Sequence, residues 1–210
     1  DFGEHEQQPY IVMQYLSGGT LEDRIKQGRI SPRKLAPIVA RIAEALDFAH
    51  ERYIIHRDVK PANIIFDSNG KAYLSDFGIA VITEASSSHY LGGTPKYMSP
   101  EQAKALRDRT PVEADSRSDI YALGVVIFEA LTGRVPYEGN TPRATVALHL
   151  TQPIPQIARF NDTLPRGFQD IIDKVLAKNP KDRYQTAKAL ADDLKDFATG
   201  RWFFHQIEDE

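Results

Sequence analysis

A carboxylate, an ammonium group and an amide lie close together in residues 56–63, which read His-Arg-Asp-Val-Lys-Pro-Ala-Asn. Asp58 could accept a proton, Lys60 could offset negative charge, and the amide oxygen of Asn63 could bind a hard cation. The apolar runs on either side, residues 53–55 and 64–66, are too short for helices and predict strand-like pieces. The polar residues are therefore expected on a tight connection, stiffened by Pro61, between two buried segments.

A second carboxylate follows a predicted β-hairpin. Residues 67–70 read Asp-Ser-Asn-Gly, and Asn-Gly tolerates the positive backbone angles that tight hairpins need. This turn joins a strand at 64–66 to a strand at 71–74, which leads to Asp76. Because the hairpin brings the outer ends of its two strands together, Asn63 and Asp76 are expected to face one hard cation.

The octet matches H-R-D-x-K-x-x-N, and Asp76-Phe77-Gly78 follows one hairpin later. Together they resemble the catalytic loop and the D-F-G motif of protein kinases. Residues 1–3 also read Asp-Phe-Gly, but no catalytic loop precedes them in this chain. Residues 93–101 resemble the end of the kinase activation segment, with Ser99 in place of the alanine of the A-P-E motif.

The residues in these motifs are most similar to those of bacterial serine/threonine kinases. The resemblance rests on Lys60, on Gly93-Thr94-Pro95 and on residues 118–124, which read Ser-Asp-Ile-Tyr-Ala-Leu-Gly. Tyrosine kinases usually lack a lysine at the position of Lys60. The resemblance therefore implies that the γ-phosphoryl group of ATP is transferred to Ser or Thr hydroxyls of protein substrates.

The same resemblance implies a role for each catalytic residue. Asp58 would orient the acceptor hydroxyl and take its proton, and Lys60 would offset charge on the moving phosphoryl group. Asn63 and Asp76 would hold Mg²⁺, and Thr94 would form hydrogen bonds near Asp58 and Lys60. The residues implied to bind ATP are Met13, Gln14, Tyr15, Leu16, Lys60, Asn63, Ile65 and Asp76.

Further residues are implied to support or regulate the site. Asp119 would brace the backbone of the catalytic loop, and Glu101 would pair with Arg183, with His56 and Phe77 as further structural residues. Arg57 would bind a phosphate added to the activation segment. The expected phosphorylation sites are Thr83, Ser86, Ser87 and Ser88. The alternative is that Arg57 pairs with a nearby carboxylate and that these hydroxyl residues belong to a solvated linker.

The elements that must position these residues are mainly helices. Residues 1–3 are expected to end a strand and 9–15 to form a second, buried strand, which residues 17–19 interrupt before a helix capped by Thr20. A helix with a Ser31 cap should run to the catalytic loop, although Pro37 lies inside it. Residues 116–133 predict a fully buried helix that ends at a glycine. Amphipathic helices are expected around 168–176 and after a Thr186 cap.

These elements predict an α+β fold like that of protein kinases, with a mainly α-helical large lobe and a small β-hairpin. Residues 1–16 would be a remnant of the small lobe and the hinge strand, 17–198 the large lobe, and 199–210 a C-terminal tail. The large lobe would contain the catalytic loop at 56–63 and the activation segment at 76–101. A Gly-rich loop, a V-A-I-K-type lysine and its glutamate partner are expected before residue 1, so that the chain alone is expected to be inactive.

Composition narrows the class of protein. The 210 residues carry 26 basic and 29 acidic side chains, net charge −3, which gives no reason to expect nucleic acid or an anionic membrane as a partner. The chain has no cysteine, its longest apolar run (120–128) is too short to cross a bilayer, and its six histidines show no metal-ligand spacing. We expect a cytoplasmic domain that acts on proteins and could dimerise for autophosphorylation, in a protein tethered to a membrane, if at all, through other segments.

Two alternatives to an active serine/threonine kinase remain. A binding or scaffold module could keep the large lobe without catalysis, although every expected large-lobe catalytic residue is present. An unrelated α+β hydrolase is disfavoured because no G-x-S-x-G nucleophile elbow or Ser/His pairing is visible.

Overall fold

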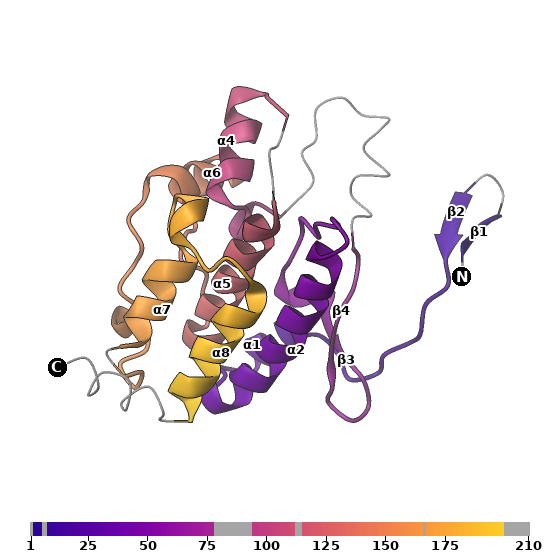
Figure 1. Cartoon of the computed structure of the whole chain (residues 1–210), viewed down its shortest axis with the longest axis horizontal. Helices are drawn as coiled ribbons and strands as arrows, with labels where there is room; N and C mark the ends of the chain where they lie inside the picture. Colours follow the sequence, from indigo (N-terminus) through magenta and orange to yellow (C-terminus); the bar gives the residue numbers. More distant parts are fainter. Residues whose placement is uncertain (1, 6–7, 78–93, 112–114, 166, 200–210) are drawn as a thin grey trace.

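The structure is a computed structural model that describes residues 2–5, 8–77, 94–111, 115–165 and 167–199 (Figure 1). It consists of a body of helices and two small β-hairpins, in agreement with the predicted α+β class. The strands are β1 (Phe2–His5), β2 (Gln8–Ile11), β3 (Ile64–Phe66) and β4 (Ala72–Leu74). The helices are α1 (Leu21–Lys26), α2 (Pro32–His50), α4 (Pro100–Asp108), α5 (Ser116–Thr132), α6 (Pro142–Thr151), α7 (Phe168–Val175) and α8 (Ala187–Ala198), with 3-10 turns η1 (Pro61–Asn63), η2 (Pro95–Tyr97), η3 (Ile157–Arg159) and η4 (Pro180–Asp182).

Helix α5 forms the centre of the body, with α2, α7 and α8 around it (Figure 1). It is buried along nearly its whole length because its sequence is apolar on all sides. The prediction of a buried helix ending at Gly133 is confirmed, since that glycine has φ +79°, which ends the helix in the left-handed region. The cap at the other end is the Asp115 side chain, which accepts the N–H of Arg117.

Helix α2 packs lengthwise against α8, and its inner face buries Leu35, Val39, Ile42 and Leu46 as the periodicity predicts. The expected Ser31 hydroxyl cap is wrong, because that side chain forms no capping hydrogen bond. Proline at the first helical position presets the backbone angle instead. Pro37 lies inside the helix on its exposed side, where water can reach a carbonyl that lacks its helical partner.

The predicted hairpin after the polar octet is confirmed. Strands β3 and β4 pair antiparallel, with Ile64 opposite Leu74 and Phe66 opposite Ala72. The side chain of Asp67 accepts the backbone N–H groups of residues 69 and 71 and so closes the turn.

The prediction of a buried strand at 9–15 is wrong beyond Ile11. Strand β2 ends at Ile11, residues 12–17 have no regular structure, and the side chains of Val12, Met13 and Tyr15 are 57%, 57% and 87% exposed. The expected strand end at 1–3 is part of a longer strand, β1. The β1–β2 pair lies to one side of the helical body (Figure 1), and a two-stranded sheet alone covers little apolar surface.

Residues 18–20 pair with β3. The N–H of Gly18 donates to the carbonyl of Phe66 at 2.7 Å, and the N–H of Phe66 donates to the carbonyl of Gly19 at 2.9 Å. A side chain could not be placed at Gly18, because its Cβ would lie 2.3 Å from the carbonyl oxygen of Asp67. The capping box of Thr20 and Asp23 follows at once and starts α1, as predicted. The segment that leads into α1 is thereby joined to the hairpin that carries Asn63 and Asp76.

Candidate active site

The backbone at the start of the predicted catalytic loop, residues 56–63, is held by the Asp119 carboxylate from the first turn of α5. Its two oxygens accept the N–H groups of His56 and Arg57, each at 2.8 Å, and the side chain is 1% exposed. The imidazole of His50, the last residue of α2, lies with Nε2 2.8 Å from the same carboxylate. These contacts hold Arg57 at φ +68°, a left-handed conformation that costs free energy for a residue other than glycine.

His56 joins the catalytic loop to the segment after β4. Its Nδ1 accepts the N–H of Asp58 at 3.3 Å, so Nε2 is the protonated nitrogen that donates to the Ser75 carbonyl at 2.8 Å. The imidazole also packs against the ring of Phe77, with 4.6 Å between centroids. His56 is buried, and these contacts set the position of Asp58 relative to Asp76.

Asp58, Lys60 and Thr94 form one hydrogen-bonded group. The Lys60 ammonium group donates to Oδ2 of Asp58 at 2.5 Å and to the Thr94 hydroxyl at 3.1 Å. The Thr94 hydroxyl and backbone N–H both donate to Oδ1 of Asp58, at 3.2 and 3.1 Å. The carboxylate is thus oriented through both oxygens while it remains partly exposed.

Asn63 and Asp76 supply the oxygen donors that a hard cation prefers. The Asn63 amide nitrogen donates to the carbonyl of Asp58 at 2.8 Å and to its Oδ2 at 3.3 Å, which leaves the amide oxygen without a partner among the described residues. Across the hairpin, the N–H of Ser75 donates to the Asn63 carbonyl, and the Ser75 hydroxyl donates to Oδ2 of Asp76. Asp76 has φ +63° and an exposed side chain. This donor set fits Mg²⁺.

The residues implied to bind ATP differ in their exposure and in their contacts. Met13 and Tyr15 are mostly exposed, Gln14 is exposed and Leu16 is half-buried. Ile65 is half-buried in β3 and lies in the bridge to Thr20. Lys60 and Asn63 both contact the Asp58 carboxylate, and Asp76 accepts the Ser75 hydroxyl.

Arg57 is exposed, and its guanidinium group forms no hydrogen bond or ion pair with any residue in the described part of the chain. Its carbonyl accepts the side-chain amide of Gln102 from α4 at 3.3 Å. The predicted phosphorylation sites Thr83, Ser86, Ser87 and Ser88 lie outside the described residues.

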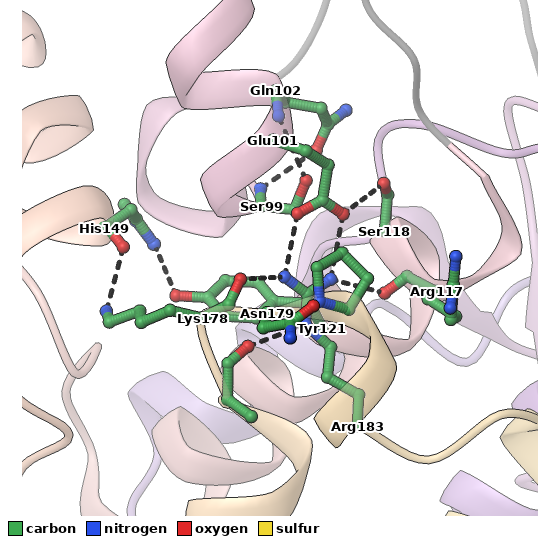
Figure 2. Close-up of polar contacts among 12 residues, drawn as sticks. Ser99, Glu101, Gln102, Arg117, Ser118, Tyr121, His149, Lys178, Asn179 and Arg183 are labelled. Carbon is green, nitrogen blue, oxygen red and sulfur yellow. Dashed lines mark hydrogen bonds and ion pairs between the residues drawn. The ribbon is translucent and has the colours of Figure 1, made fainter.

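The end of the predicted activation segment is fixed by an ion pair between Glu101 and Arg183 (Figure 2). Two guanidinium nitrogens of Arg183 each donate to one oxygen of Glu101 at 2.8 Å, and the Ser118 hydroxyl donates to Oε1 at 2.6 Å. The other Arg183 N–H bonds go to three backbone carbonyls, those of residues 117, 177 and 178. Arg183 is 2% exposed and stacks over the ring of Tyr121. Every polar group of this buried cation is therefore satisfied.

The protein environment keeps Glu101 charged. Burial favours the neutral acid, but the hydrogen bonds and positive charge of Arg183, with the Ser118 hydroxyl, outweigh it and hold the pKa of Glu101 below its usual value. The carboxylate therefore stays ionised at neutral pH, and the pair joins α4 to the segment between α7 and α8.

A second polar group beside this ion pair was not predicted from the sequence. His149 of α6 is fully buried, and its Nδ1 lies 2.9 Å from the hydroxyl of Tyr121 (Figure 2). Lys178 donates to the His149 carbonyl at 2.8 Å and to the Tyr137 hydroxyl at 2.9 Å. Burial and the nearby charge of Lys178 lower the pKa of His149 to about 4. Burial and the charge of Arg183 lower the pKa of Lys178 to about 8.

Three other supporting residues were also missed. His50 contacts Asp119, Gln102 contacts both Ser99 and Arg57, and Ser118 contacts Glu101. His50 could have been suspected from its position at the end of the helix that leads into the catalytic loop. Gln102 could have been suspected from the Ser99-x-x-Gln102 capping-box pattern at the start of α4. The contacts of Gln102 with Arg57 and of Ser118 with Glu101 join residues that are distant in the sequence and carry no local signal.

Within the described ranges, no group of three or more His, Cys, Asp or Glu side chains is arranged to hold a metal ion. The same part of the chain contains no helix long and apolar enough to cross a membrane.

Comparison with known proteins gives a consistent result. Residues 1–194 match the family described as protein kinase domain. Over 199 residues the chain is 39% identical to the serine/threonine-protein kinase PrkC of Bacillus subtilis, covering 93% of this chain and 30% of that protein. Over 196 residues it is 42% identical to the serine/threonine-protein kinase PknB of Mycolicibacterium smegmatis, covering 89% of this chain and 30% of that protein.

A solved structure supports the fold. The crystal structure of the PknI kinase domain of Mycobacterium tuberculosis matches with a TM-score of 0.71 and 27% identity, over 94% of this chain and 69% of that one. The predicted kinase-like α+β fold is thus confirmed. The chain spans about 30% of the length of the curated relatives it matches.

Proposed function

The chain belongs to the protein kinase domain family, and on that premise we propose that it transfers the γ-phosphoryl group of ATP to serine or threonine hydroxyls of proteins. The observation that carries the proposal is the Asp58 carboxylate, held through both oxygens by Lys60, Asn63 and Thr94 at the surface of the site. The relatives are named serine/threonine-protein kinases, which supports the choice of acceptor.

Asp58 acts on the acceptor hydroxyl. The hydroxyl donates a hydrogen bond to the carboxylate, which orients its oxygen and takes its proton as the oxygen bonds to phosphorus. The bond between the γ-phosphorus and the oxygen it shares with the β-phosphate breaks, and ADP departs with that electron pair.

Lys60 offsets charge on the transferred phosphoryl group, and the side-chain oxygens of Asn63 and Asp76 position the phosphates through Mg²⁺. Lys60 lies 2.5 Å from Asp58 and offsets the negative charge that collects around the transferred group. Asn63, through its free amide oxygen, and Asp76, through its carboxylate, would hold Mg²⁺. When bound, that ion neutralises phosphate charge and fixes the direction of transfer. Met13, Gln14, Tyr15, Leu16 and Ile65 would contact the adenine.

Arg57 provides a site for control of the activation segment. We propose that phosphate on Thr83, Ser86, Ser87 or Ser88, added by a second copy of the protein, accepts a forked pair of hydrogen bonds from this guanidinium. The exposed side chain has no partner among the described residues, and its backbone is fixed by Asp119 and Gln102. Because ATP is the donor, we place the reaction in the cytoplasm.

The test uses the protein that carries this chain, incubated with radiolabelled ATP and Mg²⁺ and with matched Ser, Thr and Tyr peptides. We expect label on Ser and Thr, none on Tyr, and far less label with the Asp58→Asn variant. Transfer to Tyr, or no transfer by a folded protein that binds ATP, would overturn the proposal, and the second result would favour the non-catalytic scaffold.

The 210-residue chain by itself should bind Mg-ATP weakly. Met13 and Tyr15 are 57% and 87% exposed, so the described residues offer the adenine little apolar enclosure. Calorimetric titration at micromolar ATP should show no saturable heat, and a tight complex would contradict the assignment of these residues.

A further inference from the structure

A basic groove lies outside the catalytic site, where α1, the N-terminal part of α2 and the turn between β3 and β4 meet. These elements lie side by side in Figure 1, and the groove encloses about 650 Å³. Five of its lining side chains are cationic, and no acidic residue lines it. The five are Arg24, Arg29, Lys34, Arg41 and Lys71, which we call the basic groove.

The positive charge of the basic groove is offset only in part, through the interaction of Lys71 with Asp67. None of its five cations forms an ion pair with a carboxylate in the described part of the chain, whereas the whole chain carries more acidic than basic residues. Asp67 is a carboxylate close in sequence to Lys71, but it already accepts the backbone N–H groups of residues 69 and 71. The hydrogen bond from the N–H of Lys71 contributes most to lowering the pKa of Asp67. Gathering like charges in a groove raises the local positive potential and so favours an anionic ligand.

Two of the five cations are already fixed. The guanidinium group of Arg24 stacks on the ring of Phe66, 3.2 Å from its centroid. Nε of Arg41 donates to the carbonyl of Ala72 at 3.1 Å, and its guanidinium lies 5.6 Å from the ring centroid of Tyr73. The terminal nitrogens of both remain available for carboxylate or phosphate oxygens, and fixing them in advance reduces the entropy lost on binding.

Apolar side chains lie among these cations. Ile30, Pro37 and Ile38 line the groove, so its surface is suited to a ligand that alternates charged and apolar groups. The volume exceeds the space that a single small anion needs and fits a short stretch of extended polypeptide. Such a segment places side chains on alternate sides, and thus acidic groups toward the cations and apolar groups toward the floor.

We propose that the basic groove is a docking site for an acidic segment of a partner protein, in which Glu, Asp or phosphorylated Ser alternates with apolar residues. Arg29, Lys34 and Lys71 are exposed and meet the segment at the rim, while Arg24 and Arg41 bind it deeper in the groove. The contact lies outside the group formed by Asp58, Lys60 and Thr94, and does not depend on phosphoryl transfer.

The test measures fluorescence anisotropy of short labelled peptides with the 210-residue chain in the absence of ATP. Three peptides are compared: Glu alternating with Leu, phosphoserine alternating with Leu, and Gln alternating with Leu. We expect the two anionic peptides to bind, the difference between them to identify the source of negative charge, and binding to weaken as salt is added. Equal binding of the Gln peptide, or no binding of either anionic peptide, would overturn the proposal.

Matched variants separate the groove from general charge. Arg29→Glu with Lys34→Glu should weaken binding about tenfold or more, because two attractive contacts become repulsive. Lys104→Glu with Lys181→Glu makes the same change in net charge at two exposed lysines of α4 and η4, and should have little effect. Equal weakening by both pairs would contradict a site at the groove. If the first pair fails to fold by circular dichroism, Lys71→Glu, in the exposed hairpin turn, replaces it.

Two further probes test the class of partner. A short single-stranded RNA and vesicles containing an anionic phospholipid are titrated under the same conditions. Tighter binding of either than of the acidic peptides would overturn the assignment to a polypeptide. Because no ATP is used, failure here leaves the proposed kinase reaction standing, and absence of kinase activity leaves the docking proposal standing.

Discussion

The backbone N–H and the hydroxyl of Thr94 both donate to the same carboxylate oxygen of Asp58, at 3.1 and 3.2 Å. Thr94 therefore orients the proposed proton acceptor from the opposite side to Lys60, which donates to the other oxygen. The hydroxyl also accepts from Lys60 at 3.1 Å, so one side chain contacts both Asp58 and Lys60.

Thr94→Val should lower kcat about tenfold to a hundredfold, because a hydrogen bond to a charged group contributes about 1.5–3 kcal/mol. Thr94→Ser keeps the hydroxyl and should retain most of the activity. Steady-state kinetics of the protein that carries this chain would check both. A Thr94→Val variant with unchanged kcat would show that the backbone N–H alone orients Asp58.

Asp58→Asn and Asp76→Ala should each reduce transfer to a Ser/Thr peptide, the first by about 10²–10⁴-fold through loss of the proton acceptor. They should differ in nucleotide binding. Asp76→Ala should weaken Mg-dependent ATP binding, whereas Asp58→Asn should leave it unchanged, since only Asp76 is assigned to the metal. Calorimetry of both variants with and without Mg²⁺ distinguishes the roles, and equal loss of ATP affinity would show the assignment to be wrong.

Glu101→Ala should lower the free energy of unfolding by about 3–5 kcal/mol, because it leaves the buried Arg183 cation without its partner. Lys26→Ala removes the exposed pair with Glu22 and should lower the free energy of unfolding far less. Urea unfolding of the chain measures both. Similar losses in the two variants would mean that the Glu101–Arg183 pair contributes no more than a surface contact.

The stability of the chain should fall in acid partly through His149. Its pKa is lowered to about 4 in the folded protein from an ordinary 6.5, so between these values the unfolded chain binds a proton that the folded one does not. The resulting contribution, about 3 kcal/mol, is fully present above pH 6.5 and is lost as the pH falls toward 4.

Removing the imidazole should remove this part of the acid sensitivity. Between pH 7 and pH 4, the unfolding free energy of the parent should fall by this contribution more than that of His149→Gln. The variant His5→Gln, at an exposed histidine, should follow the parent. Urea unfolding across this pH range provides the measurement. Parallel curves for the parent and His149→Gln would contradict the assigned protonation state.

Arg57→Ala should abolish activation by phosphorylation within residues 83–88, and Arg57→Lys should restore only part of it, because lysine lacks the forked donor geometry. Arg143→Ala, at an exposed arginine of α6, serves as the control. Phosphosite mapping followed by activity of the Thr83/Ser86/Ser87/Ser88 to Ala variant completes the test. An Arg57→Ala protein that still responds to phosphorylation would mean that another cation binds the phosphate.

Sequence patterns predicted the elements that depend on nearby residues. The turn at 67–70, the Thr20 cap and the glycine end of α5 are confirmed because each is set by residues within a few positions of one another. The prediction of a buried strand beyond Ile11 was wrong because Val12, Met13 and Tyr15 are exposed, and burial depends on what packs against a strand as well as on its sequence.

Contacts between distant residues were predicted only where the family resemblance supplied them. Asp119 and Glu101 were assigned in that way, and their hydrogen bonds are now described. Asp47, which accepts the N–H groups at the start of α8 from 140 residues away, and His149, which lies 28 residues from Tyr121, have no local pattern that indicates their partners. Their contacts can be recognised only when the packing of the helices is known.

The pairing of residues 18–20 with β3 has a mechanical consequence. Gly18 and Gly19 are joined to Phe66 by two hydrogen bonds, and the absent Cβ of Gly18 lets the two backbones touch. Residues 12–17 have no regular structure. Any movement of the β1–β2 pair relative to the helices would therefore have its hinge in the residues before Gly18. The β3–β4 hairpin beyond it would stay in place, and so would Asn63 and Asp76, whose oxygens we propose to hold Mg²⁺.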